Sequence, residues 1–114
     1  MKSIGVLAKI VYAVMMILFG VNHFLDVNSY IPLVPDFLPI PQVFVYLTGL
    51  AFLASGVALI INKKAQLAMI LLGVMLILFG VLVWLPKGDA GMPIFLRDIT
   101  LAAAAWFIAS HVSD

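Results

Sequence analysis

Six polar side chains near the ends of apolar segments are the residues of this chain best suited to bind a ligand. They comprise an amide, an imidazole, two carboxylates, a phenol and a guanidinium: Asn22, His23, Asp26, Tyr46, Arg97 and Asp98. Such groups donate and accept hydrogen bonds, and the ionisable ones also hold protons or pair with charges. Polar groups at membrane depth usually face a bundle interior and are candidates for function. We therefore predict that these six residues form a shallow ligand-binding site.

A second interpretation of the same residues stays open. Tyr, Asn and Arg side chains commonly anchor helix ends in the headgroup region and satisfy one another's hydrogen bonds. His23 favours a site more than its neighbours do, because it lies next to Asn22 and three residues after Gly20, on the same helical face.

Several other kinds of chemistry are excluded by residue type. The chain has no cysteine, so it forms no disulfide, thiolate metal site, iron–sulfur centre or CxxC redox motif of its own. His23 and His111 are predicted at opposite ends of their helices, so they cannot ligate one haem or one metal ion within a subunit. A net charge of +1 does not indicate binding to nucleic acid. We expect no metal or haem site and can name no catalytic residue.

The elements that must position these side chains are four long apolar segments. Hydrophobic residues make up 66% of the 114 residues and charged residues only 10%, far from the usual soluble composition. Segments 4–25, 43–61, 66–85 and 93–112 each approach the roughly 20 residues that a membrane-spanning helix needs. We predict an all-α, integral membrane four-helix bundle that forms a single domain over residues 1–114.

Connections and charges predict how the helices run. A Pro-rich linker, 26–42, joins the first two spans, and the later connections are short, so neighbouring helices should be antiparallel. Lys2, Lys63 and Lys64 would then share one side, which the positive-inside rule assigns to the cytoplasm together with both termini. Lys87 and Arg97 on the opposite side argue against this orientation.

Small residues at helical spacing predict where the helices touch. Between membrane helices, small side chains allow close backbone approach. The predicted packing residues are Gly20, Gly49, Gly56, Gly73, Gly80, Ala102 and Ala105. They could instead be scattered small residues of generic apolar helices. The segment 17–21 recurs letter for letter as 77–81, which would fit duplication of a two-helix unit but also a chance match in so apolar a chain.

Four motifs are spread over nearly the whole chain. They are Phe19-Gly20-Val21-Asn22-His23-Phe24, Val34-Pro35-Asp36-Phe37-Leu38-Pro39, Tyr46-Leu47-Thr48-Gly49 with Ser55-Gly56, and Leu96-Arg97-Asp98-Ile99. On these motifs the chain resembles the DoxX family of small four-span bacterial membrane proteins, including its DoxX-like branch. Many members of that family carry a Glu shortly after the Thr-Gly pair, and the corresponding residue of this chain is Phe52.

The DoxX resemblance implies a multi-pass protein of the prokaryotic cytoplasmic membrane. Some relatives are linked to quinone-coupled sulfur oxidation and others to redox-stress complexes, while many have no assigned activity. If the Glu of the relatives has a proton or ligand role, this chain has lost that role or performs a narrower one.

The predicted function is therefore that of a DoxX-like subunit that binds a small apolar or quinone-like ligand near His23 and Asp98, or of an accessory subunit of a membrane redox complex. The expected partners are the lipid bilayer, a second copy of the chain and membrane redox proteins. Two alternatives stay open, a small membrane transporter and a purely structural or assembly protein. A proton-coupled exporter is disfavoured because no span carries a carboxylate at its middle.

Overall fold

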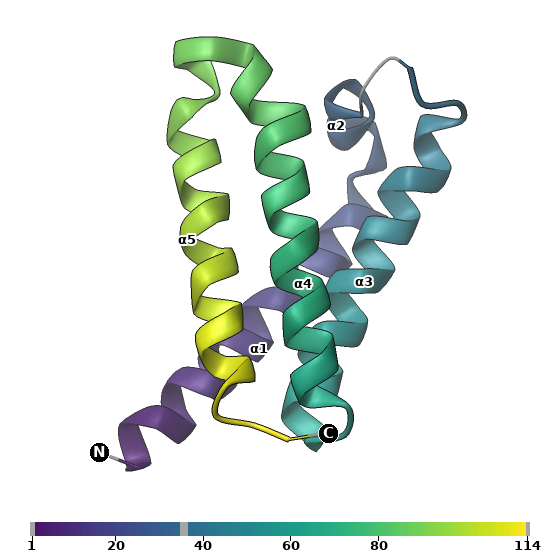
Figure 1. Ribbon diagram of the computed structural model, residues 1–114. Coiled ribbons are helices and arrows are strands. Elements are labelled where there is room, and N and C mark those ends of the chain that lie inside the picture. Colours follow the sequence, from purple (N-terminus) through teal and green to yellow (C-terminus); the bar gives the residue numbers. More distant parts are fainter. Residues whose placement is uncertain (1, 35–36, 114) are drawn as a thin grey trace.

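The computed structural model describes residues 2–34 and 37–113, and within them the chain is helical without a strand (Figure 1). The long helices are α1 (Lys2–Leu25), α3 (Pro41–Ile61), α4 (Ala65–Phe79) and α5 (Met92–Ala109). Two short elements, α2 (Val27–Tyr30) and η1 (Ile31–Leu33), fill part of the linker, and α4 continues into η2 (Gly80–Trp84) and η3 (Leu85–Ala90). The prediction of an all-helical chain with four long apolar helices is confirmed.

Local sequence explains where the helices begin and end. Pro41 opens α3 at a position where its missing N–H costs nothing. Asn62 ends α3 in the left-handed conformation, with φ 58°, which Asn tolerates better than most residues. Gly88, with φ 65°, forms the reversal between η2 and α5.

The last helix is shorter than the sequence predicts. It ends at Ala109 rather than at residue 112, and Ser110 follows in a turn. The Gln66 side-chain Nε2 donates to the carbonyl of Ala109 at 3.0 Å and to that of Val112 at 3.3 Å. These bonds satisfy carbonyls that a helix end leaves without intrahelical partners.

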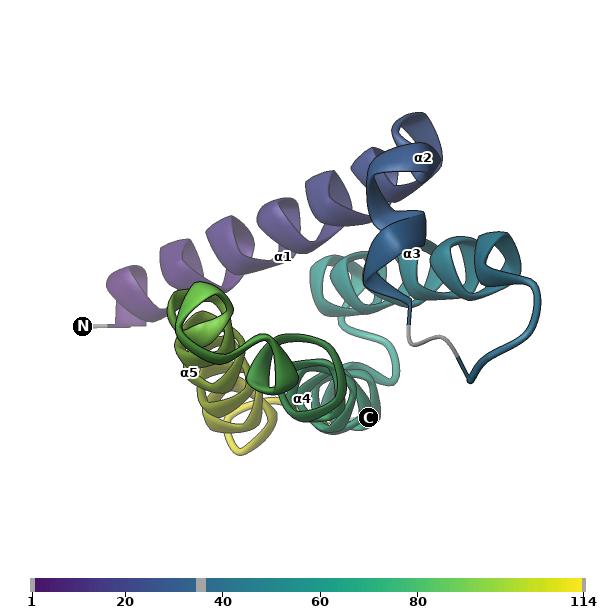
Figure 2. The same ribbon diagram turned by 90° about the horizontal axis from the view of Figure 1, so that it is seen from above.

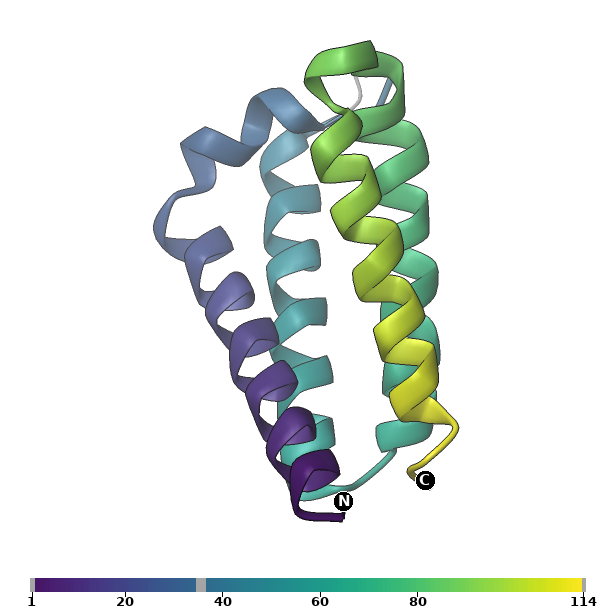
Figure 3. The ribbon, with the colours of Figure 1, turned by 90° about the vertical axis from the view of Figure 1, so that its left-hand side faces the viewer.

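The four long helices form two antiparallel hairpins. Figure 2 shows α1 beside α3 and α4 beside α5, with the turn between α3 and α4 joining the two pairs. Both termini and that turn lie at one end of the molecule, which we call the lysine end because it carries Lys2, Lys63 and Lys64 (Figure 3). The opposite end, formed by α2, η1, η2 and η3, is called the linker end.

Small residues lie where helices of the same chain approach most closely. A Cβ added at Gly20 would lie 2.7 Å from the carbonyl oxygen of Gly49, and one added at Gly56 would lie 2.6 Å from that of Ala13. In the second hairpin, Gly73 faces the Trp106 ring and Gly80 faces Phe95. Ala102 and Ala105 are fully buried at 0% exposure. The predicted packing residues therefore lie at contacts inside the bundle.

The core is narrow, and much apolar surface faces outward. Buried Met16, Leu59, Met69 and Leu72 fill the space between the helices, whereas large side chains on every long helix remain exposed: Leu7 at 62%, Leu47 at 55%, Leu71 at 58% and Phe107 at 68%. The molecule measures 43 × 27 × 19 Å.

The linker folds back over one end of the bundle. Elements α2 and η1 pack near the ends of α1 and α3 (Figure 1). Pro35 and Asp36 of the Pro-rich motif lie outside the described residues.

Candidate functional site

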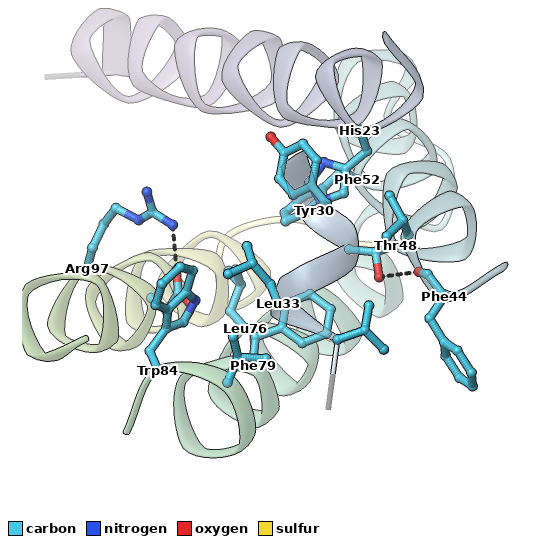
Figure 4. Close-up of a pocket in the computed structure, with 14 residues that line it drawn as sticks. His23, Tyr30, Leu33, Phe44, Thr48, Phe52, Leu76, Phe79, Trp84 and Arg97 are labelled. Atoms are coloured by element: carbon cyan, nitrogen blue, oxygen red, sulfur yellow. Dashed lines mark hydrogen bonds and ion pairs between the residues drawn. The ribbon is translucent and has the colours of Figure 1, made fainter. Parts of the chain in front are cut away.

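A cavity of about 180 Å³ lies at the linker end, between the two hairpins and below α2 and η1 (Figure 4). Side chains from α1, α2, η1, α3, α4, η2 and α5 line it, so it depends on the whole fold. Its size is close to that of the engineered apolar cavity of about 150 Å³ that takes up benzene in another protein. The cavity is therefore large enough for one aromatic ring.

His23 forms one wall of the cavity together with Tyr30. The imidazole is 9% exposed and stacks on the Tyr30 ring, with ring centroids 4.0 Å apart and planes inclined by 19°. Its Nδ1 lies 2.6 Å from the carbonyl oxygen of Phe19. Because a carbonyl only accepts, Nδ1 carries the proton in this bond, and Nε2 of the neutral ring is then an acceptor. The hydrogen bond to Phe19 thus fixes both the tautomer and the orientation of the ring.

Tyr30 is itself held in place from α1. The Asn22 side-chain Nδ2 donates to the Tyr30 hydroxyl at 2.5 Å. Asn22 is exposed and does not line the cavity. It therefore acts on the site through Tyr30, by fixing a short helix that otherwise has few contacts.

Arg97 and Asp98 supply the charged groups of the cavity. The Asp98 side chain is 4% exposed, and its Oδ1 accepts a hydrogen bond from Nη2 of Arg97 at 3.2 Å, while the Arg97 side chain is 57% exposed. Asp98 continues the buried stripe of Ala102 and Ala105 along α5. The Asp98 carboxylate thus provides a buried acceptor, and the Arg97 guanidinium provides a donor at the exposed side of the cavity.

The remaining walls are mostly apolar and aromatic. Phe52 is buried and packs against the His23 ring at 5.3 Å between centroids. Trp84 comes from the π-helical turn η2, a kind of irregularity frequent at functional sites. The Thr48 hydroxyl donates to the Phe44 carbonyl at 2.8 Å, so a ligand would meet it as an acceptor.

Three of the six predicted site residues line the cavity, and three do not. His23, Arg97 and Asp98 come together from α1 and α5. Asn22, Asp26 and Tyr46 are exposed and lie outside the lining. Tyr46 is 44% exposed and stacks on Phe24, with centroids 5.5 Å apart. The structure thus brings three of the six residues together at this cavity.

The position of Tyr46 follows from helix geometry. It lies two residues from Phe44 and from Thr48, which is about 200° around a helix. Phe44 and Thr48 line the cavity, so Tyr46 must point away from it. Asp26 precedes α2 but makes no side-chain cap hydrogen bond.

Sequence reasoning missed Tyr30, Phe52 and Trp84. Phe52 follows Gly49 by three residues and Val45 by seven, so helical spacing from Gly49 would have placed it on the buried face. Tyr30 lies in an irregular linker, where no periodicity predicts a direction. No signal in the sequence indicates the π-helical turn that carries Trp84.

The residues that the structure describes do not bring three or more His, Cys, Asp or Glu side chains together as metal ligands. The fold and site define a small all-helical protein with four long apolar helices and one mostly apolar, aromatic-walled cavity that contains His23 and Asp98.

The sequence model of the family described as Domain of unknown function (DUF8561) matches residues 12–86, and the chain belongs to this family. The matched region carries His23, Tyr30 and Phe52 and ends before α5, which supplies Arg97 and Asp98. No curated protein and no solved structure matches the chain.

Proposed function

We propose that this chain is a multi-pass membrane protein whose cavity at the linker end binds one flat, mostly apolar molecule with oxygen substituents, such as a quinone. The proposal has two parts, insertion into the bilayer and binding of a ligand. Each is supported by separate observations and tested by a separate experiment.

The outward-facing apolar surface supports membrane insertion. The four long helices are apolar enough to cross a bilayer, and only 17 to 33% of the residues in each apolar window are buried inside the molecule. Water would solvate that much apolar surface poorly. The longest dimension of 43 Å also fits a bilayer of about 40–45 Å including headgroups.

The distribution of lysines supports an orientation with both termini in the cytoplasm. Lys2, Lys63 and Lys64 lie at the lysine end, whereas Lys87 and Arg97 lie toward the linker end. Positive residues in short loops favour the cytoplasmic side. The Arg97 guanidinium is partly neutralised by Asp98, which weakens its opposing effect. In this orientation the cavity opens toward the outer face of the membrane.

The cavity at the linker end is the observation that carries the ligand part of the proposal. A planar ring fits between apolar walls, and its oxygens need polar partners. A quinone carbonyl would accept a hydrogen bond from Arg97, and a quinol hydroxyl would donate to Nε2 of His23 or to the Asp98 carboxylate. The site therefore offers partners for both the oxidised and the reduced ligand.

The DoxX resemblance points the same way. All four motifs that carry it contribute to the cavity lining, through His23, Val34, Thr48 and the Arg97–Asp98 pair. We propose that the chain acts as a ligand-holding subunit of a membrane redox complex. Phe52, where relatives carry Glu, makes this cavity more apolar.

The packing glycines favour this proposal over a protein that acts only in assembly. Gly20, Gly49, Gly56, Gly73 and Gly80 all face neighbouring helices of the same chain. They close the bundle on itself, so they do not form a seam for a partner protein.

Binding of a short-chain quinone analogue to the purified protein in detergent tests the ligand part. We expect saturable quenching of Trp84 fluorescence, because the indole lines the cavity, and we expect Trp84→Phe to remove most of it. His23→Ala removes one acceptor, and Asp98→Asn replaces a charged acceptor by a neutral amide, so each should weaken binding about tenfold.

Tyr46→Phe is the matched control, since Tyr46 is an aromatic residue at the same end of the bundle but outside the cavity. It should bind the analogue as the wild type does. Equal affinity in wild type, Asp98→Asn and His23→Ala, with all three proteins folded, would reject the proposed site.

A further inference from the structure

A second hollow in the surface lies between α3 and α4, on the side of the molecule that runs toward the lysine end. Its volume is about 290 Å³. The residues that line it are mostly small or aliphatic: Ala51, Ala54, Leu67, Ala68, Leu71 and Met75. Ser55 also contributes, but its hydroxyl donates to the Ala51 carbonyl at 2.7 Å within its own helix. The groove therefore offers an apolar surface to whatever occupies it.

The groove has one charged residue among its described lining, Lys64, and this residue lies at one end. Lys64 has φ 55° and directly precedes α4. Lys63 adjoins it in the same turn and is exposed. The carboxylates that the structure describes, Asp26, Asp89 and Asp98, all lie toward the linker end. A negative charge near this turn would thus meet two lysines and no described carboxylate.

The length of the groove matches one leaflet of a membrane. Its lining along α4 runs from Lys64 to Met75, which is about 16 Å at the helical rise of 1.5 Å per residue. The hydrocarbon core of a bilayer is about 30 Å thick, so each leaflet contributes about 15 Å. The groove therefore begins at the headgroup level of the leaflet on the lysine end and stops near the bilayer midplane.

We infer that the groove between α3 and α4 binds an acyl chain of an anionic phospholipid, with the lipid phosphate paired to Lys63 and Lys64. The inference rests on the membrane insertion proposed above and is independent of the ligand in the cavity. A groove of this volume accommodates a hydrocarbon chain, whereas a helix of a second protein is about 10–12 Å across.

A third hollow, between α1 and α5, provides an internal comparison. It has a volume of about 470 Å³ and is lined by apolar residues and Tyr12, with no charged residue among its described lining. Lys2 and Lys9 lie close to Ile4 and Ala8 along α1, so anionic lipid bound there would be weakened by Lys2→Gln and not by Lys64→Gln. The lysine whose removal weakens phosphatidylglycerol binding therefore distinguishes the two grooves.

Native mass spectrometry of the full chain, released from detergent after titration with phosphatidylglycerol or phosphatidylcholine of identical acyl chains, tests the inference. We expect one phosphatidylglycerol per chain to bind more tightly than phosphatidylcholine. Lys64→Gln should weaken phosphatidylglycerol binding about fivefold and leave phosphatidylcholine unchanged, because each lysine near the surface contributes about 1 kcal/mol to attraction of anionic lipid.

A side chain that fills the groove should weaken the binding of both phosphatidylglycerol and phosphatidylcholine. Ala54→Leu places a larger side chain in the groove from an exposed position and should weaken binding of both. Ala8→Leu in the third hollow and Lys87→Gln at the linker end are the matched controls, and both should retain phosphatidylglycerol selectivity.

Three results would overturn the inference. The first is equal binding of the two lipids to the wild type, and the second is unchanged phosphatidylglycerol binding in Ala54→Leu. The third is a change of oligomeric state in Ala54→Leu without a change in lipid binding, which would assign the groove to a second copy of the chain. Quinone-analogue binding by the same samples separates failure here from failure of the proposed cavity, because neither Lys64 nor Ala54 lines that cavity.

Discussion

His23 and Phe52 together decide the chemical character of the cavity. The imidazole offers one hydrogen-bond acceptor, and its ring lies between Tyr30 and Phe52, with centroid distances of 4.0 and 5.3 Å. Phe52 contributes no polar atom and also packs edge-on against Phe19 at 5.9 Å. A ligand therefore meets mostly aromatic and aliphatic surface, and the polar side-chain groups of the lining belong to His23, Tyr30, Thr48, Trp84, Arg97 and Asp98.

Phe52→Glu tests how strictly the site requires an apolar residue at this position. A carboxylate there would lie against Phe19 and His23, and we expect a loss of about 3 kcal/mol in the free energy of unfolding, the cost of an acidic residue at membrane depth. Phe52→Leu, which keeps the position apolar, should cost much less. Denaturant unfolding in mixed micelles, followed by circular dichroism, measures both variants. A Phe52→Glu protein as stable as Phe52→Leu would show that the cavity already accommodates a charge.

The sequence predicts the direction of a site residue only where the helix that carries it has a clear pattern of small or polar residues. The spacing of Asp98 from Ala102 and Ala105 indicates the bundle-facing side of α5, and Asp98 is buried. Helix α3 is apolar on most sides, so its sequence does not indicate that Tyr46 faces outward, whereas the spacing from Gly49 does indicate the buried face for Phe52. Tyr30 depends on the path of an irregular linker, which periodicity does not describe.

At the scale of elements, the α1–α3 hairpin depends on close backbone approach at glycines. The Cβ positions of Gly20 and Gly56 meet backbone oxygens of the partner helix, which cannot rotate away as a side chain can. The length and apolarity of the four segments were enough to predict the helices. The short connections predicted that consecutive helices are antiparallel. They did not predict that α1 packs most closely on α3 and α4 on α5.

Gly56→Ala and Gly5→Ala form a matched pair that tests this contact. The added methyl at Gly56 would lie 2.6 Å from the Ala13 carbonyl oxygen, whereas the one at Gly5 meets nothing within 4 Å. We expect Gly56→Ala to lower the free energy of unfolding by about 1–3 kcal/mol, as overpacking does. Gly5→Ala should raise it by up to about 1 kcal/mol through helix propensity. Thermal unfolding in detergent measures both, and equal behaviour of the two variants would contradict the packing of α1 on α3.

The two hairpins also share a five-residue sequence repeat, 17–21 in the first and 77–81 in the second. The repeated segment 17–21 and 77–81 places Gly20 in α1 and Gly80 at the end of α4, and each glycine faces the second helix of its own hairpin. The two contacts differ in kind, because Gly20 meets the Gly49 carbonyl oxygen and Gly80 meets the Phe95 ring. Duplication of a two-helix unit stays a prediction.

At the scale of the molecule, the proposed insertion places the lysine end and the linker end on opposite sides of a membrane. The narrow core and the exposed Leu7, Leu71 and Phe107 are explained together if lipid, not water, surrounds the helices. The cavity and the groove between α3 and α4 then lie at different depths, one near each face.

Single-cysteine labelling in intact cells tests this arrangement most directly, because the chain has no cysteine of its own. An impermeant maleimide added from outside should label Asn28→Cys and Asp89→Cys, while Ser3→Cys and Lys63→Cys should react only after the membrane is permeabilised. Labelling of Asn28→Cys and Lys63→Cys from the same side would contradict the account.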